Sequence, residues 1–212
     1  MNKLLSSIFT CLLLSSSVFF VSCSEDSSEE EEYANWQERN DAMTNQWAAN
    51  SSLKKIKCYT KDPETTGKNS DYIYVEVLED TPATNPDYKP VASTDCPFYT
   101  DTTRVAYRVR LIPSKSYPEG YVVDQSFTGD FSWRTADVTD GTGTGWIEGF
   151  STALMNMHVG DRWRVYVPYQ LAYGSSSSTG RPAYSNMIFE MALFDFWHPG
   201  ESRPEFKARA EE

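Results

Sequence analysis

A change of hydrophobic period between residues 145 and 174 constrains the fold of this chain more than any other feature. Apolar residues first recur at helical spacing, which predicts one short helix whose buried face carries Trp146, Phe150, Leu154 and Met157. A turn follows, with Gly160 as the C-terminal cap of the helix. The period then changes to strict alternation, typical of a half-buried strand, at Trp163, Val165 and Val167. Pro168 ends this strand.

The other regular elements are mainly strands. Alternating or β-branched and aromatic runs predict strands over residues 56–59, 72–78, 103–112 and 187–196. Residues 33–50 favour a helix, with an aromatic stripe that packs against the main domain. The proline-rich residues 81–94 predict a loop, and residues 132–145 are polar and glycine-rich. The pattern predicts an α+β fold: an antiparallel sheet crossed by one short helix, with an N-terminal helical extension.

The first residues predict export rather than fold. Lys3 precedes an apolar run over residues 4–21, and Ser22-Cys23 follows directly. This resembles a lipoprotein signal peptide (1–22), with Cys23 as the lipidated first mature residue, although Phe20 stands where an aliphatic residue is usual. An ordinary cleaved signal peptide or a membrane anchor is the alternative interpretation.

Residues 23–32 are strongly acidic and predict a solvated, self-repelling tether after the lipidated cysteine. Similar acidic runs occur in surface lipoproteins of some Gram-negative bacteria. The resemblance implies an exported protein with a lipid anchor in the cell envelope, at the outer membrane and exposed on its surface. A flexible spacer at another membrane face is equally compatible with the sequence.

Charge and cysteine content narrow the possible partners. The formal net charge is −11, and loss of Lys3 with the signal peptide takes it to −12. Such acidity argues against nucleic acid and against electrostatic binding to anionic lipid. Cys58 and Cys96 remain after processing, and a disulfide between them is left open by the sequence. His158 and His198 have no partners at ligand spacing, so no metal site and no cofactor are predicted.

Short motifs spaced along residues 104–196 resemble the FKBP-type peptidyl-prolyl isomerases, in the order typical of that family. They are Val-Ala-Tyr-Arg-Val from Val105, Gly-Tyr-Val-Val-Asp-Gln-Ser from Gly120, Gly-Trp-Ile-Glu-Gly-Phe from Gly145, Val-Gly-Asp-Arg-Trp from Val159, Leu-Ala-Tyr-Gly from Leu171, and Arg-Pro-Ala-Tyr-Ser-Asn-Met-Ile-Phe-Glu from Arg181. The resemblance divides the remaining chain into an N-terminal helix with extra strands and loops (33–100), an FKBP-like domain (101–197) and a polar tail (198–212).

The resemblance also implies a pocket for proline-containing polypeptides. Its floor would be Trp146, and its substrate-binding residues would include Tyr107, Val123, Trp133, Gly143, Ile147 and Phe189. Tyr173 would donate a hydrogen bond to a substrate carbonyl, and Asp124 would polarise the substrate or a tyrosine hydroxyl. Taken singly, a buried Trp before a helix or a Phe on an alternating strand is more often an ordinary core residue.

Departures from the family pattern leave a second function open. Thr142-Gly143 replaces an apolar ledge whose backbone N–H binds substrate, and Val123 replaces an aromatic wall residue. The flap over residues 175–180 lacks apolar side chains, for which Pro182 and Tyr184 are partial substitutes. The chain is therefore either an isomerase acting on X-Pro bonds or a non-catalytic module of the same fold that binds a peptide or an envelope protein.

Overall fold

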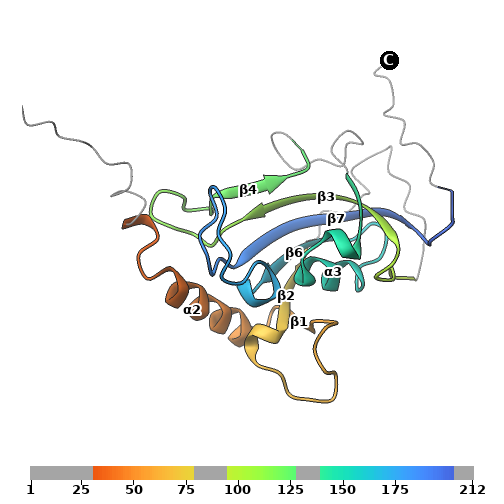
Figure 1. Ribbon diagram of the computed structural model, residues 1–212. Helices are drawn as coiled ribbons and strands as arrows, with labels where there is room; N and C mark the ends of the chain where they lie inside the picture. Colours follow the sequence, from red (N-terminus) through yellow and green to blue (C-terminus); the bar gives the residue numbers. More distant parts are fainter. Residues whose placement is uncertain (1–30, 79–94, 128–138, 203–212) are drawn as a thin grey trace, which may run out of the picture.

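Seven antiparallel strands form one curved sheet in the computed structural model, which describes residues 31–78, 95–127 and 139–202 (Figure 1). The strands are β1 (Lys54–Lys57), β2 (Tyr72–Val77), β3 (Thr102–Arg110), β4 (Val122–Gln125), β5 (Thr139–Thr142), β6 (Arg162–Val167) and β7 (Met187–Trp197). Their order in the sheet is β1-β2-β6-β7-β3-β4, and β5 pairs with β3 beside β4. The helices are α2 (Trp36–Ala49) and α3 (Glu148–Leu154), with 3-10 turns at Asn69–Asp71, Gly143–Gly145 and Tyr169–Leu171. The predicted α+β architecture is confirmed.

Some sequence predictions fall outside the described residues. They are the signal peptide, Cys23 and most of the acidic tether, the loop over residues 81–94, Trp133, and most of the polar tail.

The long central pair, β3 and β7, separates two chemically different faces of the sheet. Val105 and Val109 on β3 are buried with Phe189 on β7, whereas Arg108 and Arg110 point to the other side. Helix α3 covers the apolar face, where Phe150 and Leu154 are buried. The alternation in the sequence thus places the core between α3 and the sheet.

Helix α3 is shorter than the predicted run from residue 146 to 157. Ile147 has an extended backbone, so the helix begins at Glu148. After Leu154, the N–H groups of Asn156 and Met157 donate three residues back, which tightens the last turn. Met157 is fully buried although it lies beyond the helix. Gly160, with φ +101°, turns the chain into β6 and donates to the carbonyl of Leu193, so it is not the cap of α3.

Strand β5 lies in the polar, glycine-rich segment over residues 132–145, for which the sequence predicted no regular element. Its partner residues are 102–105 of β3. The Arg104 guanidinium binds both carboxylate oxygens of Asp140, at 2.8 and 2.9 Å, and the Thr103 hydroxyl donates to the carbonyl of Gly141 at 3.0 Å. These cross-strand bonds override the weak strand propensity of Thr-Asp-Gly-Thr.

Residues 33–78 extend the same sheet rather than forming a separate unit. Strand β2 pairs with β6, and β1 continues the sheet beyond β2. Helix α2 packs through the Trp47 ring, whose centroid lies 5.2 Å from that of Tyr166. The Trp36 indole N–H donates to the hydroxyl of Ser185 at 2.9 Å, so both ends of α2 are held against the domain.

The last two residues of the predicted acidic tether, Glu31 and Glu32, contact the domain. Lys115 forms an ion pair with Glu31 at 2.8 Å. The Ser116 hydroxyl donates to the Glu32 carboxylate at 2.6 Å. Hydrogen bonds from Ser114 and Ser116 lower the pKa of Glu32 to about 2. The rest of the predicted tether lies outside the described residues.

Both described cysteines are free, so the disulfide left open by the sequence is not formed. Cys58 is buried and accepts a hydrogen bond from the Thr152 hydroxyl at 3.3 Å. Cys96 lies near the imidazole of His158, with 3.6 Å between Sγ and Nε2.

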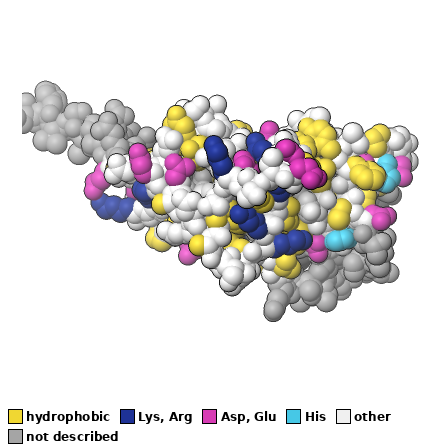
Figure 2. Space-filling view, turned by 90° about the horizontal axis from the view of Figure 1, so that it is seen from below, with side chains coloured by type: hydrophobic (Ala, Val, Ile, Leu, Met, Phe, Trp, Pro, Cys, Tyr) yellow, Lys and Arg dark blue, Asp and Glu magenta, His cyan; other side chains and the backbone are white. Residues whose placement is uncertain are grey.

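Acidic and basic side chains are interspersed on the face shown in Figure 2, and apolar groups lie between them. On the described part of this face no continuous basic stripe is visible. Neither described helix is long and apolar enough to cross a bilayer.

Gly149 sets the distance between α3 and β6, and its replacement by alanine is expected to destabilise the protein. A Cβ at this position would overlap Cγ1 of Val167, which is fully buried and rigid. The overlap outweighs the gain in helix propensity, so Gly149→Ala should lower the free energy of unfolding by about 1–3 kcal/mol in urea titrations. Gly145→Ala, whose Cβ would meet no atom within 4 Å, is the matched control. A Gly149→Ala protein as stable as the wild type would contradict this packing.

Candidate functional site

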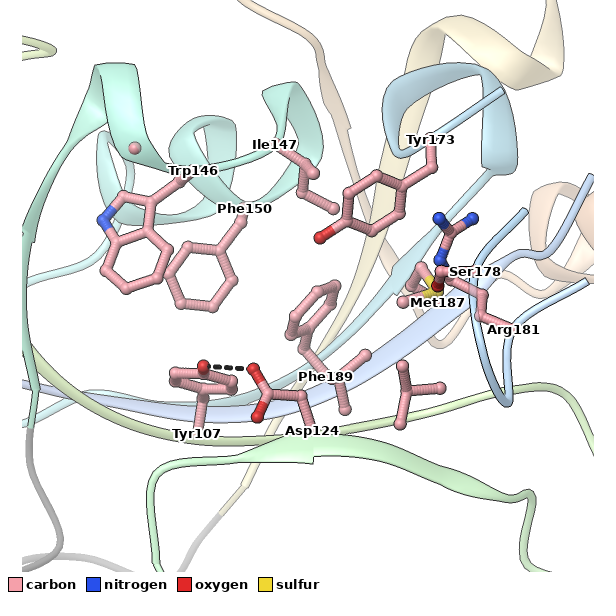
Figure 3. A pocket seen from close by; sticks show the side chains of 13 residues that line it. Tyr107, Asp124, Trp146, Ile147, Phe150, Tyr173, Ser178, Arg181, Met187 and Phe189 are labelled. Carbon is pink, nitrogen blue, oxygen red and sulfur yellow. Dashed lines mark hydrogen bonds between the residues drawn. The ribbon is translucent and has the colours of Figure 1, made fainter. Parts of the chain in front are cut away.

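A cavity of about 450 Å³ opens between α3, strands β3, β4 and β7, and the segment that follows β6 (Figure 3). The structure gathers there seven of the residues that the sequence predicted: Tyr107, Val123, Asp124, Trp146, Ile147, Tyr173 and Phe189. The side chains come from segments up to 82 residues apart in the sequence, and the antiparallel pairing of β3 with β4 and β7 brings them together.

Aromatic rings form one end of the pocket. The Trp146 and Phe150 ring centroids are 4.9 Å apart, and Tyr107 meets both edge-on, at 6.0 and 5.7 Å. Phe189 closes the cluster, 5.1 Å from Phe150. Each such pair contributes about 0.5–1.5 kcal/mol beyond its buried area, so this wall is rigid before any ligand enters.

The position of Trp146 depends on a glycine in β5. A Cβ on Gly141 would overlap the indole ring, so only glycine lets the ring lie against that strand. The ring precedes α3, and Ile147 follows it at the helix N-terminus. The aromatic floor is therefore built jointly by β5 and by the extended entry to α3.

The polar centre of the pocket is the pair formed by Tyr107 and Asp124 on neighbouring strands. The Tyr107 hydroxyl donates to Oδ2 of Asp124 at 2.6 Å (Figure 3). The other carboxylate oxygen accepts from the backbone N–H of Gln125 at 2.8 Å. Burial, and then the Asp124 carboxylate, raise the pKa of Tyr107, so its hydroxyl stays protonated at neutral pH. The pair presents one fixed carboxylate to the pocket.

Tyr173 lies on the opposite wall, and 47% of its surface is exposed. It follows the 3-10 turn after β6, and the positive φ of Gly174 turns the chain immediately afterwards. Its hydroxyl points into the cavity (Figure 3). It is placed to donate a hydrogen bond to a bound carbonyl.

The prediction for Gly143 is wrong. Its N–H donates to the backbone carbonyl of Tyr99 at 3.1 Å, and the residue borders a separate small cavity near Phe98. A Cβ on Gly143 would overlap the Tyr99 backbone, so a close approach between two chain segments explains the glycine. The N–H is therefore engaged within the fold.

The suggested flap substitutes are also wrong. Neither Pro182 nor Tyr184 lines the pocket, and the Tyr184 ring packs edge-on against Tyr169, 5.4 Å away. Ser178 in the flap and Arg181 directly after it reach the cavity.

Sequence reasoning missed further lining residues, namely Val109, Gly145, Phe150, Ser178, Arg181 and Met187. Val109 and Phe150 belong to apolar faces that the periodicity did identify, but nothing in the sequence separated pocket from core on those faces. Arg181 begins the last family motif, and its charge gave no indication that it would be buried.

Among the described residues that line the cavity, no nucleophile is paired with a base. In the described ranges, no three His, Cys, Asp or Glu side chains lie close enough together to hold a metal ion. The pocket can enclose an apolar ring against Trp146 and offer polar groups to a neighbouring carbonyl, which is the chemistry of binding rather than of bond cleavage.

Comparison with known proteins agrees with this geometry. Residues 97–194 match the family model of the FKBP-type peptidyl-prolyl cis-trans isomerases. The chain is 41% identical over 58 residues to the macrophage infectivity potentiator of Trypanosoma cruzi, covering 27% of this chain and 30% of that protein. It is 30% identical over 118 residues to FkpA, an FKBP-type isomerase of Escherichia coli, covering 55% of this chain and 39% of FkpA. The chain thus spans less than half the length of these curated relatives.

Solved structures share the fold at low sequence identity. A peptidyl-prolyl cis-trans isomerase from Pseudomonas syringae matches with a TM-score of 0.52 and 19% identity, over 77% of this chain and 95% of that one. The crystal structure of Escherichia coli FkpA matches with a TM-score of 0.53 and 20% identity, over 81% of this chain and 63% of that one. Residues 97–194 therefore match the FKBP-type peptidyl-prolyl cis-trans isomerase family in sequence, and the solved structures show that the chain shares the fold of such isomerases.

Proposed function

We propose that this protein catalyses cis-trans isomerisation of X-Pro peptide bonds in proteins outside the cytoplasm. The observation that carries the proposal is the preformed aromatic pocket floored by Trp146 and lined by the Tyr107–Asp124 pair and the Tyr173 hydroxyl. The leader and the acidic segment support export and a lipid anchor at Cys23, in the cell envelope of a Gram-negative bacterium. The clients would be proline-containing polypeptides of that compartment.

The chemistry follows from the electronic structure of the amide. Rotation about the bond faces a barrier of about 18–20 kcal/mol because resonance gives it partial double-bond character. Water stabilises the charge-separated resonance form, whereas the twisted transition state is less polar. A pocket that replaces water by the rings of Trp146, Phe150 and Phe189 therefore favours the twisted state, and catalysis is differential binding.

A protease-coupled assay with an X-Pro peptide tests the proposal. At micromolar protein, the observed rate constant should exceed the uncatalysed one by at least about tenfold. Tyr173→Phe should lower kcat/KM by about tenfold, because one hydrogen bond to the carbonyl is lost. Tyr117→Phe removes an exposed hydroxyl outside the pocket and should leave the rate unchanged. A wild-type rate at the uncatalysed background would overturn the proposal.

A second candidate function is peptide binding without turnover, by a module of the same fold. The observation that favours it is the engagement of the Gly143 N–H by Tyr99, which removes a donor that family resemblance assigned to the substrate. In that case X-Pro peptides would bind in the pocket with no increase in isomerisation rate.

A further inference from the structure

The pocket has two chemically different ends. Trp146, Phe150 and Tyr107 form the aromatic end, and the Arg181 guanidinium lies at the far end beside Tyr173 (Figure 3). An apolar pocket for proline does not in itself require a cation, so Arg181 calls for an explanation.

Arg181 is held firmly in this position. Its guanidinium carbon lies 4.0 Å from the centroid of the Tyr173 ring, a cation–π contact. Nη1 donates to the backbone carbonyl of Ser176 at 2.6 Å. Two backbone hydrogen bonds of 2.9 Å tie Arg181 to Ser178 across the flap turn. The side chain is therefore preorganised rather than free to swing into solvent.

The charge of Arg181 is not neutralised within the described part of the chain. The residue is only 6% exposed, yet no described Asp or Glu forms an ion pair with it. The Asp124 carboxylate also lines the cavity but is engaged by Tyr107 on the opposite wall. A guanidinium has five N–H donors, and one hydrogen bond to Ser176 leaves others for a ligand.

We propose that Arg181 is a specificity-determining residue that binds a carboxylate next to the proline of the substrate. The inference rests on the proposed function, because it assumes that the proline ring occupies the aromatic end. A planar guanidinium backed by a ring matches a carboxylate in two parallel hydrogen bonds. A Glu or Asp side chain immediately before or after the proline carries such a carboxylate. The protein should therefore bind peptides with an acidic residue beside the proline more tightly than neutral peptides.

Peptide pairs with blocked termini test this preference. Acetyl-Ala-Glu-Pro-Phe-amide is compared with its Gln analogue, and acetyl-Ala-Ala-Pro-Glu-amide with its Gln analogue, so that each side of the proline is tested separately. Binding is measured by NMR titration, and isomerisation by exchange between the cis and trans signals. The wild type should bind at least one Glu peptide five- to twentyfold more tightly than its partner, and added salt should reduce the difference.

Variants separate charge from packing. Arg181→Gln should abolish the preference for Glu, and Arg181→Lys should keep part of it, because the charge remains while the bidentate geometry is lost. Arg110→Gln removes an arginine from the opposite face of the sheet, and this variant should keep the full preference for Glu peptides.

The outcomes distinguish this inference from the proposed function. Equal wild-type affinity for Glu and Gln peptides overturns the role of Arg181 even if both peptides are isomerised, and so does a preference that survives Arg181→Gln. If none of these peptides binds, both proposals fail. The wild-type comparison is decisive even if Arg181→Gln does not fold.

Discussion

Replacing Asn186 with alanine is expected to lower the free energy of unfolding by about 3–5 kcal/mol, measured by urea denaturation. Asn186 is fully buried and joins α2 to the end of the sheet. Its side-chain NH₂ group donates to the backbone carbonyl of Asn40 at 2.7 Å and to the Thr44 hydroxyl at 3.1 Å. Its side-chain oxygen, Oδ1, accepts a hydrogen bond from the backbone N–H of Tyr169 at 2.8 Å. Alanine leaves that buried N–H without its acceptor, together with a void.

The matched control is Asn45→Ala, on the exposed side of the same helix. Asn45 accepts a single exposed hydrogen bond from Asn69, so its loss should cost less than about 1 kcal/mol. Equal effects of the two substitutions would contradict the assignment of α2 as an integral part of the domain.

A double-mutant cycle on Tyr107 and Asp124 should show that the two side chains act as one unit in catalysis. Tyr107→Phe and Asp124→Ala should each lower kcat/KM for X-Pro isomerisation by about ten- to thirtyfold, because the 2.6 Å hydrogen bond is lost in both. The double variant should lose little more than either single one, since the second change removes nothing that remains. Stability measured on all three proteins separates this effect from unfolding.

If the fold decrease in kcat/KM of the double variant equals the product of the two single decreases, the coupled pair is contradicted, because Tyr107 and Asp124 would then have independent roles. Full activity in both single variants would instead leave catalysis to the aromatic rings alone.

The sequence predicted the strands that carry most of the site because their periodicity is strong. Tyr107 and Phe189 lie on alternating runs and Trp146 begins the apolar helical run, but their assignment to one pocket came from the family resemblance. The burial of α3 against the sheet follows from the same pattern.

What the sequence could not predict depends on contacts between distant segments. Strand β5 is stabilised by the ion pair between Asp140 and Arg104. The sequence Thr-Asp-Gly-Thr shows no alternation of apolar and polar residues, so it did not indicate a strand. Gly143 resembled an open ledge residue, but the approach of Tyr99 engages its N–H. Arg181 was identified only as the first residue of a family motif, and only the fold places it beside Tyr173.

The most direct test of the central claim is two-dimensional NMR exchange spectroscopy on an X-Pro peptide with a catalytic amount of the protein. The Trp146 indole N–H is followed in the same samples as a reporter of pocket occupancy. We predict cis-trans exchange cross-peaks for the proline that are absent without protein, together with a peptide-dependent shift of the indole signal. An indole shift without exchange cross-peaks would contradict the account, because the pocket would then bind proline without isomerising it.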